Sequence, residues 1–329
     1  MFDEYVRSVT KEDRIKLPRL SYSGMEQFKN CPYAYDLKYN KKLYANDKTL
    51  ALELGSLLHY VLEQRIKYII NDKPIDYDIL IDILNNGVIE TDEKTKEHIL
   101  GLGELKRKYF EEWYEPDNKS GMDYNQKMKV FQKALYHEME DTSEWRPAYV
   151  ELPFEFVYKD RVIFNGFIDR IDLNSNGEFR VIDYKSSKTG YDNIKLSTSL
   201  QFGVYALAIC QMFGKLPIEF LYRFVLIDET QKAMTKGWER RLEKALDKIL
   251  DGIEKDKKTG YPVPKPCPLC AWCSFSITNP KAKQYKDKCE YYSLWTPNNP
   301  CWGVNKKYNA LDVVRNKCNN EVKKRKLNF

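Results

Sequence analysis

The spacing of hydrophobic residues changes near residue 145, and this change divides the predicted secondary structure into two parts. Before it, apolar residues recur every three to four positions, which is typical of helices that bury one face. The pattern predicts a helix after Ser21 and Ser23, which are suitable N-cap residues, and a second helix across 52–70. Helical spacing continues between 75 and 140, broken by Gly, Pro and Asn.

After residue 145, β-branched and aromatic residues gather in short runs that predict strands. Three runs follow one another at 149–158, 161–173 and 178–185, and they indicate a three-strand meander. The elements expected next are a helix, a strand and a charged helix, at 197–213, 218–227 and 231–254. This order predicts an α/β fold in which a central mixed sheet is flanked by helices and carries a helical insertion.

The chain shows no internal repeat and no long linker that would force a division. We therefore expect one domain over 1–290, followed by a basic extension at 291–329. Within the domain we expect a helical part, a core and a cysteine-rich strap, at about 20–145, 146–255 and 260–290.

Positive charge is concentrated at the C-terminal end. The net charge is +6, but residues 281–329 hold 12 lysines and arginines against four acids, which leaves the rest nearly neutral. Such a segment favours contact with a phosphate backbone, and a solvated tail is an equal alternative.

The first twenty residues are charged throughout and lack the apolar run of a secretory signal, and no stretch reaches the length of a membrane span. We expect a cytoplasmic protein in a reducing compartment, with no membrane partner. The eight cysteines then serve as metal or catalytic residues rather than as disulfides.

Acidic residues lie near the ends of two neighbouring predicted strands. A three-residue loop at 175–177, with Gly177 in the left-handed position, pairs positions whose numbers add up to 352. Asp169 then lies opposite Asp183, and Lys185 shares the face of Asp183. A two-residue Asn-Gly loop would instead shift the pairing by one residue and turn Asp169 away.

Two opposed carboxylates repel each other, so a cation is expected between them. A divalent ion such as Mg²⁺ suits hard carboxylate oxygens and a substrate phosphate, with Lys185 close by. The alternative is an exposed lattice of salt bridges in which Asp169, Arg170, Asp172, Asp183 and Lys185 take part.

A second group of possible metal ligands lies near the C-terminus. Cys267, Cys270 and Cys273 follow a C-x2-C-x2-C spacing, and Cys289 comes fifteen residues later. Four thiolates suit structural zinc and an iron–sulfur cluster equally well, so the spacing leaves both open.

The acidic hairpin resembles a known nuclease signature. "GFIDRID" and "VIDYK" resemble motifs II and III of the PD-(D/E)XK nuclease superfamily, in the branch of the RecB and AddB nuclease domains and the CRISPR-adaptation exonucleases. "GSLLH" at 55–59 is similar to its motif I, and "QFGVY" at 201–205 to its Q-x-x-x-Y helix. "SYSGMEQFKNCPYAY" resembles the entry helix that carries a cluster cysteine.

The resemblance implies a role for each matching residue. His59, Asp169, Asp183 and the main-chain carbonyl of Tyr184 would bind Mg²⁺ or Mn²⁺. Lys185 would orient or activate the attacking water and offset negative charge. The remaining matches, Gln201 and Tyr205, would position the lysine or the DNA strand.

The resemblance also favours a [4Fe–4S] cluster over zinc, because one cysteine of the entry helix joins three C-terminal cysteines in that branch. We predict the ligands Cys31, Cys270, Cys273 and Cys289, with Cys267 as the substitute for Cys289. The spacing here departs from the C-x2-C-x5-C of the branch. Three cysteines have no predicted ligand role: Cys210, expected to be buried, Cys301 and Cys318.

The function implied is that of a metal-dependent DNA nuclease, an exonuclease on single-stranded or frayed ends in recombination, repair or DNA processing. A helicase or recombination protein would be its partner, since the chain has no nucleotide-binding P-loop of its own. The competing class is a non-catalytic DNA-binding or scaffold protein with a degenerate nuclease fold. A zinc-stapled protein without a nucleic-acid partner is a third.

Overall fold

The computed structural model describes residues 5–45, 48–91, 96–109, 124–136, 144–187, 189–233, 237–265, 268–276, 279, 284–285 and 288–289. Two compact units emerge from the contacts within the chain. The sheet unit comprises residues 1–19 and 48–242, and the cysteine unit comprises residues 20–47 and 243–329. The basic extension predicted at 291–329 lies outside the described residues, so its role stays a prediction.

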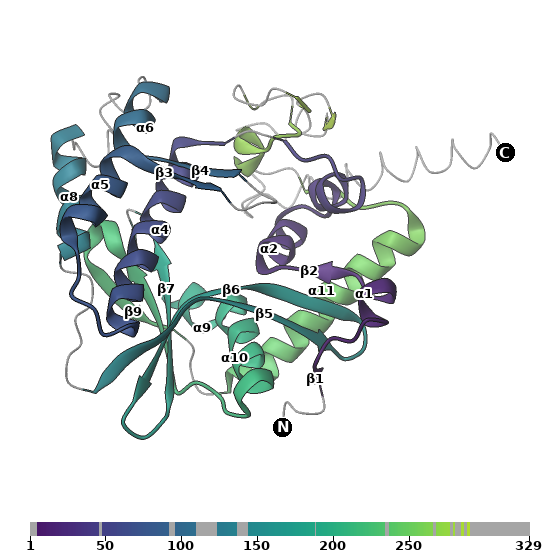
Figure 1. Cartoon of the computed structure of the whole chain (residues 1–329). Coiled ribbons are helices and arrows are strands. Elements are labelled where there is room, and N and C mark those ends of the chain that lie inside the picture. Colours follow the sequence, from purple (N-terminus) through teal and green to yellow (C-terminus); the bar gives the residue numbers. More distant parts are fainter. Residues whose placement is uncertain are drawn as a thin grey trace. The chain divides into compact units, whose positions relative to one another are not determined.

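A mixed β-sheet forms the centre of the sheet unit, which confirms the predicted fold class (Figure 1). The three-strand meander is present as β5 (Trp145–Tyr158), β6 (Val162–Asn174) and β7 (Phe179–Lys185), each antiparallel to the next. The strand order is β1-β5-β6-β7-β8-β9. Strand β8 (Glu219–Phe224) lies between β7 and β9, and the two ends of this order are β1 (Val6–Arg7) and β9 (Glu229–Lys232).

Helices cover both faces of β7 and β8. On one face, Ile182, Tyr184 and Leu221 join a buried cluster with α4 (Leu50–Ile70) and with helices of the predicted insertion. Those helices are α5 (Tyr77–Asn86), α6 (Leu102–Lys108) and α8 (Tyr124–Tyr136). Alternate strand residues point to the opposite face, where Phe220 and Tyr222 contact α10 (Leu200–Phe213).

The helix α10 is a core element. The crossover from β7 to β8 runs through α9 (Asn193–Ser197) and α10, and it makes these two strands parallel. The segment Asn193–Phe213 is long and apolar enough to cross a membrane, but 67% of its apolar window is buried inside the structure. Its burial against the sheet explains its composition.

The turn between β6 and β7 has the predicted register. All four pairs, from Arg170 with Ile182 to Leu173 with Phe179, add up to 352. Gly177 has a φ of +70°, and its N–H donates to the carbonyl of Asn174 at 3.0 Å, which closes the three-residue loop. The shift produced by a two-residue loop is therefore excluded.

Two predicted helical stretches contain strands instead. Residues Lys96–Leu100 form β4, which pairs with β3 (Gly87–Thr91) in a two-stranded sheet. The charged helix begins at Trp238 rather than at 231, because β9 pairs with β8 before it, and this helix, α11, extends to Thr259. Both strands depend on hydrogen bonds to a partner strand, which the local pattern of apolar residues does not reveal.

The cysteine unit begins with the predicted capped helix. In α2 (Tyr22–Asn30), Ser21 Oγ accepts a hydrogen bond from the N–H of Gly24 at 3.2 Å. The short helix α3 (Pro32–Tyr35) and a π-helical turn (Asp36–Asn40) follow. A Cβ at Gly252 of α11 would lie 2.8 Å from the ring of Phe28, so glycine allows α2 and α11 to approach closely.

Candidate active site

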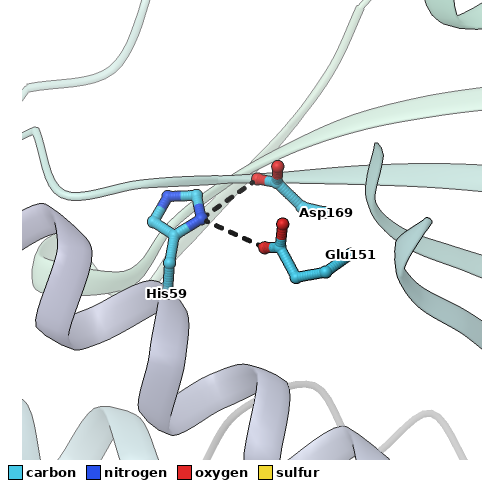
Figure 2. Close-up of side chains that lie close together, drawn as sticks. All are labelled: His59, Glu151 and Asp169. Carbon is cyan, nitrogen blue, oxygen red and sulfur yellow. Dashed lines mark ion pairs between the residues drawn. The ribbon is translucent and has the colours of Figure 1, made fainter. Parts of the chain in front are cut away.

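Three side chains of types that can bind a metal converge at the sheet. His59 comes from α4, Glu151 from β5 and Asp169 from β6 (Figure 2). The Nδ1 atom of His59 lies 3.6 Å from Asp169 Oδ2 and 3.8 Å from Glu151 Oε1. One ligand atom from each residue falls within 4.8 Å of the others, a grouping that could hold a metal ion. The side chain of His59 is 33% exposed, so solvent can reach this group.

Sequence reasoning left Glu151 without a role, although it belongs to this group. The β5–β6 pairs around it add up to 320, which sets Glu151 opposite Asp169. This register follows from the three-residue loop at 159–161, which contains no glycine to reveal it. Glu151 also has a φ of +44°, a left-handed conformation that costs free energy for a non-glycine residue and that recurs at functional sites.

The second motif carboxylate, Asp183, has a different set of partners. Its Oδ1 accepts a hydrogen bond from Gln201 Nε2 at 2.6 Å, and its Oδ2 forms an ion pair with Lys185 Nζ. Lys185 Nζ also donates to Gln201 Oε1 at 3.2 Å. The Tyr205 hydroxyl lies 3.0 Å from Gln201 Nε2 and 3.5 Å from Asp183 Oδ1. The Q-x-x-x-Y residues thus contact the predicted catalytic pair.

The two sets of residues meet where β6 and β7 separate. Their backbone pairing ends at Arg170 and Ile182, one position before the two aspartates. Beyond it, the backbone N–H of Tyr184 donates to Asp169 Oδ2 at 2.8 Å, so a side chain replaces the ladder bond. The opening between the strands is where the carboxylates gather.

The electrostatics of the site favour a cation. The pKa of Asp169 is raised well above its ordinary value, mainly by burial and to a smaller extent by the negative charge of Asp183. Burial lowers the pKa of His59, but Asp169, Glu151 and Asp183 outweigh it and raise that pKa to about 9. Burial likewise opposes charge on Lys185, whose pKa is nevertheless raised by Asp183 and Asp169. The negative charge therefore exceeds what the described side chains neutralise.

The alternative of an exposed salt-bridge lattice is wrong. Arg170, Asp172 and Arg180 are at most 3% exposed and form a separate buried ion triad. Both arginines donate to Asp172, at distances between 2.6 and 3.1 Å. Asp169 and Asp183 are also buried. The charged residues of this hairpin therefore divide into a structural triad and the acidic site.

The cysteine unit contains a pocket of about 250 Å³. Among the residues that line it are the four predicted cluster ligands, Cys31, Cys270, Cys273 and Cys289. Lys38 and Lys265 line it as well, and none of the described lining residues carries a carboxylate. The pocket thus combines four thiols with cationic side chains.

Short segments fix the positions of these thiols. Cys31 lies between α2 and α3, and its Sγ accepts a hydrogen bond from the N–H of Lys265 at 3.4 Å. Cys270 belongs to a 3-10 turn (Pro268–Trp272), and its carbonyl accepts from the N–H of Cys273. Cys289 donates its N–H to the Phe275 carbonyl at 2.8 Å.

The remaining cysteines fall elsewhere. Cys210 lies in α10 of the sheet unit and is partly exposed rather than buried as expected, because it occupies the last, less covered turn of that helix. Cys267, Cys301 and Cys318 lie outside the described residues.

Comparisons with known proteins identify a family match and several relatives. The family model of the PD-(D/E)XK nuclease superfamily matches residues 19–278. The chain is 24% identical over 277 residues to the "Gene 69 protein" of Mycobacterium phage D29, and the match covers 78% of this chain and 96% of the phage protein.

The chain is also similar in sequence to two bacterial proteins. The chain is 28% identical over 202 residues to a subunit of the ATP-dependent helicase/deoxyribonuclease of Clostridium perfringens strain SM101, covering 58% of this chain and 17% of that protein. The corresponding protein from Clostridium tetani is 26% identical over 215 residues, covering 58% and 18%. The chain therefore spans less than a fifth of these clostridial proteins.

Proposed function

The chain belongs to the PD-(D/E)XK nuclease superfamily, and on that premise we propose that it is a metal-dependent DNA exonuclease acting on single-stranded or frayed ends. The observation that carries the proposal is the convergence of His59, Glu151 and Asp169 beside the Asp183–Lys185 pair. A module that only binds DNA has no need of this set. The names of the clostridial relatives include deoxyribonuclease, which supports DNA as the substrate.

The donor set fits a hard divalent cation. His59, Glu151, Asp169 and Asp183 would hold Mg²⁺ or Mn²⁺, together with the main-chain carbonyl of Tyr184. A strand residue presents its N–H and C=O to the same neighbour, so the Tyr184 bond to Asp169 supports this use of the carbonyl. When bound, the cation supplies Lewis-acid stabilisation of the phosphate that is attacked.

The other residues of the site act on water and on the phosphate. The Lys185 ammonium, held between Asp183 Oδ2 and Gln201 Oε1, orients the attacking water and offsets negative charge as the phosphoester bond breaks. Gln201 fixes Asp183 and Lys185 at once, through its amide nitrogen and its oxygen. Tyr205 supports Gln201 from one helical turn further along α10.

End-labelled single-stranded DNA with Mg²⁺ or Mn²⁺ tests this function. We expect Lys185→Ala and Asp183→Ala each to lower the cleavage rate by about 100-fold or more, the loss typical for removal of a charge-stabilising group. Lys232→Ala is the matched control, because Lys232 pairs with Glu219 at the sheet edge. If both site variants cleave at the wild-type rate, the assignment is wrong.

Comparing labels at the 5′ and 3′ ends gives the polarity of digestion. Mononucleotides released from one end support an exonuclease, whereas internal fragments support an endonuclease. Metal-independent DNA binding without cleavage by the wild type would instead favour a binding or scaffold protein with a degenerate nuclease fold.

We also propose that Cys31, Cys270, Cys273 and Cys289 hold a [4Fe–4S] cluster. The four thiols line one pocket, and the N–H of Lys265 donates to Cys31 Sγ, a kind of bond that tunes cluster sulfurs. The cluster would be structural, because it would link α2 to a segment more than 230 residues later in the chain. Cys267 stays the substitute ligand, and zinc the alternative metal.

Anaerobic purification tests the cluster. We expect a brown protein that contains equal amounts of iron and acid-labile sulfide, and we expect Cys31→Ser and Cys270→Ser to lose both. Cys210 lies in α10 of the sheet unit, so Cys210→Ser is the control and should keep both iron and sulfide. A colourless protein that contains zinc in place of iron would contradict the cluster.

We further propose that the protein works in the cytoplasm beside a helicase or a recombination protein. The clostridial relatives are named as parts of a helicase/deoxyribonuclease, which supports a partner that unwinds DNA. Such a partner would supply the single strands on which the proposed exonuclease acts. Copurification of a helicase with the tagged protein from its host would support this arrangement.

A further inference from the structure

Phe167 is an aromatic side chain that the sheet unit leaves in solvent. It lies in β6 and is 59% exposed, whereas three other phenylalanines of the same hairpin are at most 7% exposed. Those three are Phe154, Phe156 and Phe164. The hairpin of β5 and β6 buries these three rings but presents Phe167 to the outside, where most of its surface gains no burial free energy within the described structure.

The surroundings of Phe167 connect it with the catalytic carboxylates. It precedes Asp169 by two residues in β6, so their Cα atoms are about 6.6 Å apart at the usual rise of a strand. That separation is comparable with the length of one nucleotide in an extended single strand. Directly across on β5, Pro153 is exposed as well, so the two side chains form an apolar step beside the acidic site.

We propose that Phe167 is a base-stacking residue that holds the nucleotide next to the scissile phosphate. The proposal rests on the proposed nuclease function, because a phosphate bound at Asp169 brings the neighbouring base within reach of the ring. Every base has a π-face, so an aromatic ring can hold any sequence. Bases of an intact duplex are already stacked on one another, and Phe167 therefore selects single-stranded or frayed ends.

A double-mutant cycle, in which one change is made in the protein and the other in the DNA, tests this contact. The probes are end-labelled single-stranded oligonucleotides in which an abasic spacer replaces one base at successive positions from the scissile phosphate. For the unmodified oligonucleotide we expect Phe167→Ala to raise KM by roughly 5- to 150-fold, the value of one lost stacking contact. The kcat should change much less, because the ring does not touch the reacting atoms.

The abasic spacer should reveal which base Phe167 contacts. At one position next to the scissile phosphate, the spacer should raise the KM of the wild type by the same factor and leave the KM of Phe167→Ala unchanged. Phe167→Trp should keep the low KM and the sensitivity to the spacer. A merely structural residue would show neither this position dependence nor this rescue.

The same KM measurements provide a control variant and the results that would contradict the stacking proposal. Ile15→Ala removes another exposed apolar side chain of the sheet unit, 86% exposed in α1 (Asp13–Lys16), and should leave KM unchanged. If the spacer raises KM equally in wild type and Phe167→Ala at every position, the stacking proposal is wrong although the nuclease function stands. If the wild type cleaves no DNA, both proposals fall together.

Discussion

Gln201 contacts both charged groups of the Asp183–Lys185 pair with a single amide. It donates from Nε2 to Asp183 and accepts at Oε1 from Lys185, while Tyr205 lies 3.0 Å from the same nitrogen. An amide satisfies both partners because it carries a donor and an acceptor, which a carboxylate or an ammonium group does not. Gln201 is therefore a positioning residue for the lysine.

We predict that Gln201→Ala lowers kcat by about 10- to 100-fold, the range seen when partners of catalytic or metal-binding groups are removed. The Mg²⁺ concentration for half-maximal activity should rise as well, because Asp183 loses a hydrogen bond that orients it. Steady-state cleavage at a series of Mg²⁺ concentrations measures both effects.

Gln211→Ala is the control for that experiment. Gln211 lies on the same helix, and its amide donates to Ser8 Oγ on the exposed side of the sheet unit. Equal activities of the two variants would show that Gln201 does not position the site.

At this scale the sequence assigned roles to some residues and left another without a role. The register that brings Asp169 and Asp183 to the same end of the β6–β7 pairing followed from Gly177, because glycine marks the left-handed position of the loop. Glu151 was left without a role because its hairpin turns at 159–161, where Lys159 and Asp160 adopt positive φ without a glycine. Its own strained backbone is not readable from residue type.

The β6–β7 hairpin carries a buried ion triad next to the acidic site. Asp172 accepts from both Arg170 and Arg180, and Arg180 also lies 4.8 Å from the centre of the Trp145 ring. Arg170 donates in addition to the hydroxyl of Tyr184 at 3.2 Å. The triad therefore links β6 to β7, the strand that supplies Asp183 and Lys185.

We predict that Asp172→Ala lowers the free energy of unfolding by about 3–5 kcal/mol, because it leaves two buried guanidinium groups without their carboxylate. Urea denaturation followed by circular dichroism measures this loss.

Glu219→Ala removes the carboxylate of a largely exposed ion pair with Lys232 and should cost at most about 1 kcal/mol. Similar losses for Asp172→Ala and Glu219→Ala would mean that the triad is not a source of stability.

Element prediction succeeded where the local pattern decided the structure. The meander strands, the capped helix α2 and the long helix α4 carry their own signals in apolar spacing and caps. The strands β3, β4 and β9 were missed because each is stabilised by a neighbouring strand, and helix-like composition was overridden by that pairing.

At the scale of the whole chain, the cysteine unit is assembled from two distant stretches. Cys31 belongs to 20–47, whereas Cys270, Cys273 and Cys289 belong to 243–329. A cluster that binds thiols from both stretches stabilises the folded unit by its binding free energy, since the site is absent from the unfolded chain. The sheet unit has its own core and contains none of the four thiols.

We predict that Cys31→Ser makes the full-length protein more sensitive to trypsin within 20–47 and 243–265, because the linked stretches separate more often. Peptide mapping over time should show cuts in 48–242 appearing later. Cys210→Ser should digest like the wild type. Unchanged cleavage in Cys31→Ser would contradict a stabilising role of the cluster.

The bond from the Tyr184 amide to Asp169 Oδ2 gives the protein an internal spectroscopic reporter. That amide proton is held by a carboxylate oxygen rather than by a carbonyl of the neighbouring strand, so its chemical shift responds to whatever else the carboxylate binds. An isotope-labelled sample titrated with a non-catalytic divalent ion would show the amide resonance of Tyr184 moving as the site fills. Binding of the divalent ion could then be followed at the amide that is hydrogen-bonded to Asp169, with no substrate present.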